Sequence, residues 1–296
     1  MSLHVMEEHD WERLVRQLGK GACTPFLGAG ASADVLPMAA KLSEELADEW
    51  DYPHADRDVL INVAQHGVIK FGESATVKEQ ICERLRGIGP PNLSKRHEPY
   101  KLLSSLPIPV YMTTNYDDLI LQSLRTAGKS PNVALCPWNS GIEYDRALFD
   151  DHAGWDPAPE APLVYHLHGR WEEPSSIVVC EDDYHEFIFN LALDRGTESS
   201  KMLPPAIFEA LTARTLLFIG YSMRDSTFRF MFDSLLRAVP AINRRRHISV
   251  LLPPRVDSAK LKDQQKWLDR YYEKWQVTIF WGTASEFCRQ LRRRMK

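Results

Sequence analysis

The chain has 296 residues, a formal net charge of −4, and 44% hydrophobic and 26% charged residues. A chain of this length can bury a large core and form one α/β domain that carries an insertion. The slightly acidic balance argues against direct nucleic-acid binding, and no apolar run approaches the ~20 residues that cross a bilayer, so no membrane partner is expected.

The cysteines are scattered along the chain and none forms a C-x-x-C pair: Cys23, Cys82, Cys136, Cys180 and Cys288. This spacing argues against a zinc ribbon and predicts free thiols in a reducing compartment. We therefore expect a cytoplasmic protein without a metal site. The acidic, amphipathic N-terminal residues do not resemble a signal peptide.

A helix is predicted over 7–19, and the stretch TPFLGAGASADV follows at 24–35, where an apolar run ends in two glycines. Glycine between a strand and a helix has two explanations: a tight turn, or a phosphate that approaches the backbone at a helix N-terminus. The dinucleotide motif G-x-G-x-x-G is incomplete, because Ala33 replaces its third glycine. This stretch alone leaves both explanations open.

Residues 37–50 read as a helix, and residues 51–100 are charged and helix-like, which predicts a helical insertion. Apolar, β-branched runs then predict strands within 108–120, 162–169, 176–184, 214–225, 247–254 and 277–282. Such strands, alternating with helices, predict a buried, mostly parallel sheet flanked by helices. We therefore expect a Rossmann-like α/β fold in which 1–296 is one domain and 51–100 an insertion.

Polar residues, several of them glycines, follow four of the predicted strands: Gly28 to Ser32, Thr113 to Asp117, His168 to Arg170, and Gly220 to Ser222 with Asp225. In an open parallel sheet, ligands bind outside the carboxyl ends of the strands. Each group could be only a turn or a cap, and Asn115 and Asp117 could cap the helix that follows them. The four groups together predict one ligand site at this edge of the sheet.

Four motifs, FLGAGAS, TTNYDDL, HLHG and FIGYSMRD, occur in this order between residues 26 and 225. They resemble the ordered motifs of sirtuin-like domains, specifically the bacterial branch associated with antiphage defence. The resemblance implies a Rossmann-like domain that binds NAD as its substrate and breaks the bond between nicotinamide and ribose. The zinc ribbon of deacylase sirtuins is missing, which argues against protein deacylation; the defence branch lacks it as well.

The resemblance implies that Asn115 and His168 are catalytic. An amide can donate and accept at once, which suits Asn115 to the ribose hydroxyls or a water. A histidine with an ordinary pKa of about 6.5 can act as general base, the role expected of His168. NAD-binding residues are expected at the other motif positions: Gly28, Ala29 and Gly30 at the pyrophosphate, with Ser32; Thr114 and Asp117; Gly220 and Ser222 at the adenosine ribose; and Asp225, whose role is unassigned.

His166 lies two residues before His168, and we expect both side chains on one strand and one face. These histidines could bind a metal together with Glu181 or Asp182, but the sequence has no H-x-x-x-H or Cys/His spacing typical of metal sites. We therefore expect His166 to be packed in the protein interior.

The motifs favour an NAD hydrolase, an NAD+ glycohydrolase that serves as the effector of an antiphage defence system. Two alternatives stay open: an NAD-dependent protein deacylase, and a non-catalytic nucleotide-binding assembly subunit. Since an unrestrained NAD hydrolase would harm its own cell, we expect a homo-oligomer that acts with a separate partner, such as a HerA-type ATPase or a short Argonaute. The insertion at 51–100 is the expected surface for assembly, because a mostly charged insertion adds little to a core, and the aromatic content supports assembly.

Overall fold

The computed structural model describes residues 6–32, 39–86, 98–149, 156–194, 202–221, 245–253 and 258–295. Its strands are β1 (Cys23–Leu27), β2 (Val110–Thr113), β3 (Asn132–Leu135), β4 (Leu163–His166), β5 (Thr215–Ile219), β6 (His247–Leu251) and β7 (Val277–Trp281). Its α-helices are α1 (Glu8–Gly19), α2 (Ala39–Glu49), α3 (Leu60–Phe71), α4 (Ser74–Arg86), α5 (Pro99–Ser104), α6 (Leu119–Thr126), α7 (Glu181–Asp194), α8 (Pro205–Ala213), α10 (Ser258–Glu273) and α11 (Ala284–Arg294). Short 3₁₀ turns are η1 (Ala29–Ser32), η2 (Arg146–Phe149) and η3 (Pro174–Ser176).

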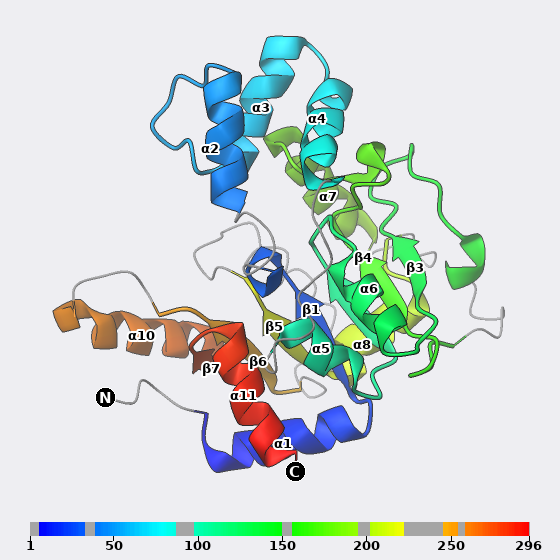
Figure 1. Cartoon of the computed structure of the whole chain (residues 1–296), viewed down its shortest axis with the longest axis vertical. Coiled ribbons are helices and arrows are strands. Elements are labelled where there is room, and N and C mark those ends of the chain that lie inside the picture. The colour runs from blue at the N-terminus through cyan, green and yellow to red at the C-terminus, as the bar shows by residue number, and fades with distance from the viewer. Residues whose placement is uncertain are drawn as a thin grey trace.

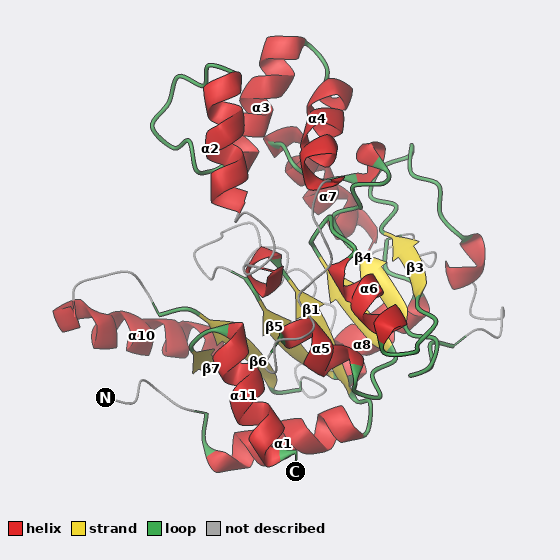
Figure 2. Ribbon diagram, viewed as in Figure 1, coloured by secondary structure: helices red, strands yellow, loops and turns green. Residues whose placement is uncertain are grey.

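The seven strands form one sheet in the order β3-β4-β2-β1-β5-β6-β7, and every described pairing is parallel. Figure 2 shows this sheet between layers of helices. The predicted α/β fold with a parallel sheet flanked by helices is therefore confirmed. From β1 the chain passes to β2 on one side, and it later returns to β5 on the other side, so the strand order reverses at β1. This reversal is the position where open α/β sheets bind ligands.

Two elements differ from the sequence prediction. The run at 176–184 is not a strand: Ile177 to Cys180 are buried but irregular, and α7 begins at Glu181. The apolar run is buried against helices instead of in the sheet, because Ile177, Val179 and Cys180 belong to a cluster with the helices α2 to α4. Conversely, the edge strand β3 was not predicted, since its residues are only partly buried and give a weak pattern.

Successive residues of the strands pack on opposite faces of the sheet, as the strand period of two requires. Phe26 and Met112 join one apolar cluster, and their neighbours Leu27 and Tyr111 join the other. The first cluster includes residues of α7 and α8, and the second includes residues of α1, α5, α6 and α11. Near-continuous apolar strands are thus explained by a sheet that is covered on both faces.

The helices α2, α3 and α4 pack together beyond the carboxyl end of the sheet, and we refer to them as the helical bundle (Figure 1). The bundle begins at Ala39, upstream of the predicted insertion at 51–100. It contains a third apolar cluster, built on Leu46, Trp50, Val63 and Ile81. The expectation that this charged region adds little to a core is therefore wrong: its polar residues lie outside and its apolar ones meet inside.

No helix in the described part of the chain is both long and apolar enough to cross a bilayer.

Candidate functional site

The turns after β1 and β5 interlock through their backbones at the point where the strand order reverses. Gly30 N donates to Gly220 O at 2.8 Å, and Gly28 N donates to Ile219 O at 2.9 Å. Gly220 has a φ of +87°, and a Cβ added to it would lie 2.1 Å from Ala31 N. Only glycine fits this position, because any side chain would collide with the opposite turn.

The same contact accounts for the two glycines of the opening turn. A Cβ on Gly28 would lie 2.9 Å from Gly220 O, and one on Gly30 would lie 2.9 Å from Gly220 Cα. The tight-turn explanation therefore suffices for both glycines, whether or not a phosphate also binds there. Ala29 and Gly30 are exposed, so their backbone remains accessible to a ligand.

Tyr221 connects the ends of three strands, although it was not among the expected site residues. Its hydroxyl donates to Leu27 O at 2.8 Å and lies 3.0 Å from Thr114 Oγ1. Thr114 N also donates to Leu27 O, at 3.0 Å. Thr114, an expected NAD-binding residue, is thus part of the scaffold that holds β1, β2 and β5 together. A signal was available, because Tyr221 directly follows a strand-ending glycine.

Asn115 and Asp117 are both buried in the turn after β2. Asn115 Nδ2 donates to Gly28 O at 3.1 Å, which orients the amide toward the opening turn. Asp117 Oδ1 accepts from Leu119 N at 2.9 Å, at the start of α6. Asp117 thus accepts the first N–H of α6 from the position before the N-cap residue Asp118, while Asn115 bridges two strand ends.

The two histidines have different surroundings, contrary to the expectation that both lie on one strand. His166 ends β4, and its Nδ1 lies 3.2 Å from Asn115 O. His168 lies two residues beyond the strand, and its ring packs edge-on against Tyr184 and Phe187, with centroids 5.3 and 5.0 Å away. The strand period of two does not extend to His168, because the chain turns after His166.

Burial lowers the pKa of His168 to about 3, and burial together with Arg170 lowers the pKa of His166 to about 3. The ordinary pKa expected of His168 is therefore wrong, because burial favours the uncharged ring and weakens it as a base. The Nε2 atom of His168 is buried and lacks a hydrogen-bond partner in the described part of the chain, whereas His166 has backbone contacts with Asn115 and Gly169. Buried polar atoms are normally paired, so Nε2 of His168 is suited to meet a bound molecule.

A bidentate ion pair joins the two turns that carry Asn115 and His168. Arg170 Nε and Nη2 donate to the two carboxylate oxygens of Asp118 at 2.9 and 2.8 Å. Both side chains are mostly buried, and Arg170 also lies 2.8 Å from the half-exposed Glu172. Burial is the main influence on Asp118 and raises its pKa, against the opposing effect of Arg170. The pair was missed because single charged residues after a strand resemble ordinary turn residues.

Ser222 and Asp225 lie outside the described residues, and Ser32 lies in η1 with its side chain outside the description.

The five cysteines are buried and free, in agreement with the predicted thiols. Among the described residues there is no group of three or more His, Cys, Asp or Glu that could hold a metal ion.

Comparison with known proteins places these strand ends in a family context. Residues 109–280, more than half of the chain, match the family described as SIR2-like domain. A protein named NAD(+) hydrolase ThsA from Cytobacillus dafuensis is 31% identical over 226 residues, which cover 75% of this chain and 39% of that protein. Proteins of the same name from Enterococcus faecium and Bacillus cereus (strain MSX-D12) are 27% and 29% identical, over 86% and 76% of this chain and 49% and 42% of those proteins. The chain spans less than half the length of these relatives.

Proposed function

Because this chain belongs to the SIR2-like domain family, we propose that it hydrolyses NAD at the bond between nicotinamide and ribose. The observation that carries the proposal is that Asn115 and His168 lie on the turns after the adjacent strands β2 and β4, with the Asn115 amide bonded to Gly28 O at the strand-order reversal. The relatives named NAD(+) hydrolase support the same chemistry. They also favour hydrolysis of NAD over protein deacylation.

The reaction needs little proton chemistry at the leaving group. Cleavage passes through an oxocarbenium-like state, as in glycoside hydrolysis, and nicotinamide leaves as a neutral molecule. We assign Asn115 to the ribose hydroxyls or the attacking water. We assign His168 to the proton that water or ribose must lose. Burial keeps its ring neutral but lowers its pKa to about 3, so in the chain without substrate the ring is a weak base. Its Nε2, which has no hydrogen-bond partner among the described residues, can accept that proton when Nδ1 carries the ring hydrogen.

The expected NAD-binding residues remain part of the proposal. Ala29 and Gly30 offer an exposed backbone to the pyrophosphate. Gly220 and Ser222 are assigned to the adenosine ribose, and Tyr221 fixes the turn that begins at Gly220. Asp117 acts through the start of α6, whose first N–H it accepts. NAD is the substrate in this scheme, and no step requires a metal.

We further propose that the activity serves antiphage defence and is released by a separate partner protein, for which a HerA-type ATPase or a short Argonaute are candidates. Since NAD is essential to the cell that makes the protein, the activity needs a restraint. The alternative of a nucleotide-binding assembly subunit predicts NAD binding without cleavage. Under this alternative, the buried, neutral ring of His168 would have no catalytic role.

The decisive experiment follows free nicotinamide by chromatography after incubation with NAD, with and without an acetyl-lysine peptide. We expect nicotinamide release that does not depend on the peptide. Asn115→Ala and His168→Ala should each reduce the rate by ~10²–10⁴-fold, the usual contribution of general acid–base groups. His166→Ala is the comparison, with a milder expected loss. A circular dichroism spectrum checks that each variant is folded. Release that requires the peptide would favour a deacylase, and wild-type rates in both variants would refute the assignments.

A further inference from the structure

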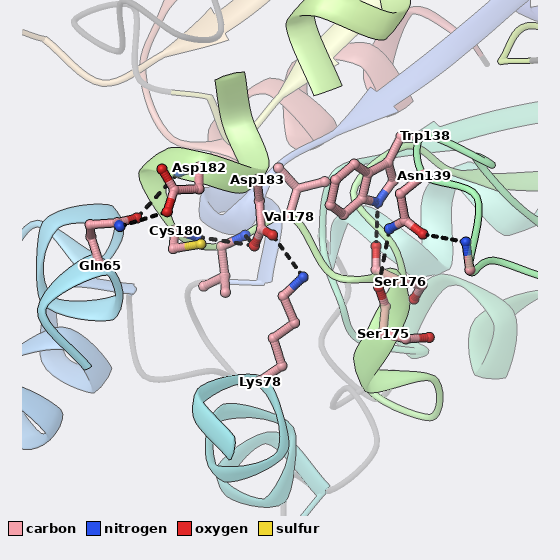
Figure 3. Close-up of polar contacts among 12 residues, drawn as sticks. Gln65, Lys78, Trp138, Asn139, Ser175, Ser176, Val178, Cys180, Asp182 and Asp183 are labelled. Atoms are coloured by element: carbon pink, nitrogen blue, oxygen red, sulfur yellow. Dashed lines mark hydrogen bonds and ion pairs between the residues drawn. The ribbon is translucent and has the colours of Figure 1, made fainter. Parts of the chain in front are cut away.

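The helical bundle reaches the turn that carries His168 through one buried ion pair. Lys78 of α4 lies with its Nζ 2.7 Å from Asp183 Oδ1, and the side chains are only 8% and 9% exposed. Asp183 belongs to the first turn of α7, 105 residues further along the chain. Figure 3 shows the Lys78 side chain extending from α4 to this carboxylate.

The other oxygen of Asp183 holds the segment that precedes α7. Asp183 Oδ2 accepts from Val179 N at 3.0 Å and from Cys180 N at 3.3 Å. The next residue back, Val178, donates its backbone N–H to His168 O at 3.1 Å. A continuous path of contacts thus runs from Lys78 through the carboxylate to the backbone of His168.

A second set of contacts leads from the same lysine to the other side of this turn. The Lys78 ammonium lies 5.1 Å from the centroid of the Trp138 ring, whose Nε1 donates to Ser176 O at 2.7 Å. Ser176 O is also the atom that faces Gly169, since a Cβ added there would lie 2.2 Å from it. The residue after His168 is therefore held against a segment that Trp138 fixes.

Stability alone does not explain this arrangement. Removing two charges from water costs several kcal/mol per ion, and well-packed apolar residues in place of a buried ion pair are often neutral or stabilising. The surrounding residues are apolar, because Val77, Ile81 and Val179 belong to the cluster of the bundle. An ion pair in this position fixes one geometry of the charged groups, where apolar side chains would permit several.

We propose that Lys78 and Asp183 are positioning residues for the reaction: through this pair the helical bundle fixes the backbone of the His168 turn. The inference rests on the proposed function of His168 as the group that accepts a proton. A small displacement of such a group can cost as much as 10²-fold in rate.

The test compares the wild-type chain with Lys78→Met and Asp183→Asn. We expect kcat for nicotinamide release to fall at least tenfold in both variants, while KM for NAD stays within threefold. Hydrogen exchange followed by mass spectrometry should show faster exchange in peptides that contain the Val178 amide. Thermal melts measure the folded fraction, and rates are expressed per folded molecule.

The matched control is Gln65→Ala. Gln65 Nε2 donates to Asp182 Oδ2 at 2.8 Å, and Asp182 N donates to Gln65 Oε1 at 3.2 Å, so this pair joins the same bundle to the same helix at an exposed site. The control should keep the wild-type kcat and the wild-type exchange at Val178. Figure 3 shows both pairs reaching the start of α7.

Two results separate the inference from the function on which it rests. Wild-type kcat per folded molecule and wild-type exchange in Lys78→Met would overturn the positioning role, whatever the melting temperature. A wild-type protein that binds NAD but releases no nicotinamide would refute the proposed function. In that case, unchanged exchange at Val178 in Lys78→Met would also overturn the positioning role. Faster exchange there would support the inference that the ion pair fixes the backbone of the His168 turn.

Discussion

At the scale of single residues, the glycine turn shows how one sequence feature can have two causes. Gly28, Gly30 and Gly220 are required by backbone contact between two strand ends, so their presence does not itself demonstrate a phosphate. A bulky side chain at position 30 would clash with the backbone of Gly220, whether or not a ligand is bound. Ala29 is the better probe, because it is exposed and makes no such contact.

Ala29→Asp should weaken NAD binding without unfolding the protein. A carboxylate beside the proposed pyrophosphate repels it, and at an exposed site near a protein surface like charges a few ångströms apart interact by ~1–4 kcal/mol. We expect an increase of at least tenfold in the Kd for NAD, measured by titration calorimetry, and an unchanged melting temperature. Ala29→Ser is the neutral control. If Ala29→Asp and the control bind NAD with equal affinity, the pyrophosphate does not bind at this turn.

The buried histidines predict a loss of stability in acid. A group whose pKa is lowered by folding binds fewer protons in the folded state, so stability is present above the unfolded pKa of about 6.5 and is lost as the pH falls toward the folded value of about 3. For His168 the loss between pH 7 and pH 5 is about 2 kcal/mol.

His168→Leu keeps an apolar contact with Tyr184 and Phe187 and removes the titrating group. Between pH 7 and pH 5, this variant should lose about 2 kcal/mol less unfolding free energy than the wild-type chain. Urea denaturation at both pH values measures the difference. Parallel pH dependence in the two proteins would show that the His168 ring titrates normally in the folded state.

At the scale of elements, the site depends on contacts between strand-end turns that are distant in sequence. Asp118 follows β2 and Arg170 follows β4, and their ion pair spans the turns that carry Asn115 and His168. Both partners are mostly buried, which distinguishes this pair from the exposed ion pairs of the helices. Removing one partner leaves a buried charge without compensation.

Arg170→Met should therefore destabilise the protein by about 2–4 kcal/mol, somewhat less than the loss for a fully buried pair, because 15% of the Arg170 side chain and 10% of the Asp118 side chain remain exposed. Glu172→Gln removes the exposed partner of the same guanidinium and should cost no more than ~0.5 kcal/mol. Chemical denaturation compares the two variants. If the two variants lose the same free energy of unfolding, the Asp118–Arg170 contact contributes little to holding the turns together.

At the scale of the whole molecule, the aromatic residues give less support to assembly than their number suggested. The largest fully buried side chains include Trp11, Trp50, Tyr100, Tyr111 and Phe218, so much of the aromatic content fills the three apolar clusters. The bundle nevertheless exposes large apolar side chains, of which Ile69 on α3 is 74% accessible. Homo-oligomer formation through this bundle stays a prediction.

Light scattering on the purified chain should give a mass above the 34.0 kDa of one copy. Ile69→Glu should lower that mass, because a charge opposes burial at an apolar contact. Leu252→Glu is the control, since Leu252 is 61% exposed in the segment after β6 and does not belong to the bundle. A wild-type mass of one copy at micromolar concentration would contradict the prediction.

The sequence by itself determined the strand ends and the layers. Six strands of the sheet lie within apolar runs, because a strand covered on both faces must be apolar along its whole length. The residues that follow these runs are the polar turns of the site, since parallel strands bring their carboxyl ends to one edge. These inferences need only local composition and the strand period.

The tertiary structure decided which element covers which apolar run and which charges meet. Residues 177–180 have the composition of a strand, yet the bundle buries them as an irregular segment. Lys78 and Asp183 are ordinary surface residues in the sequence, and they form a buried pair only because α4 lies against η3, at the segment before α7. The pKa of His168 likewise depends on its distant neighbours. Local patterns report that a residue will be buried, but its partners are set by chain segments that come together only in the folded molecule.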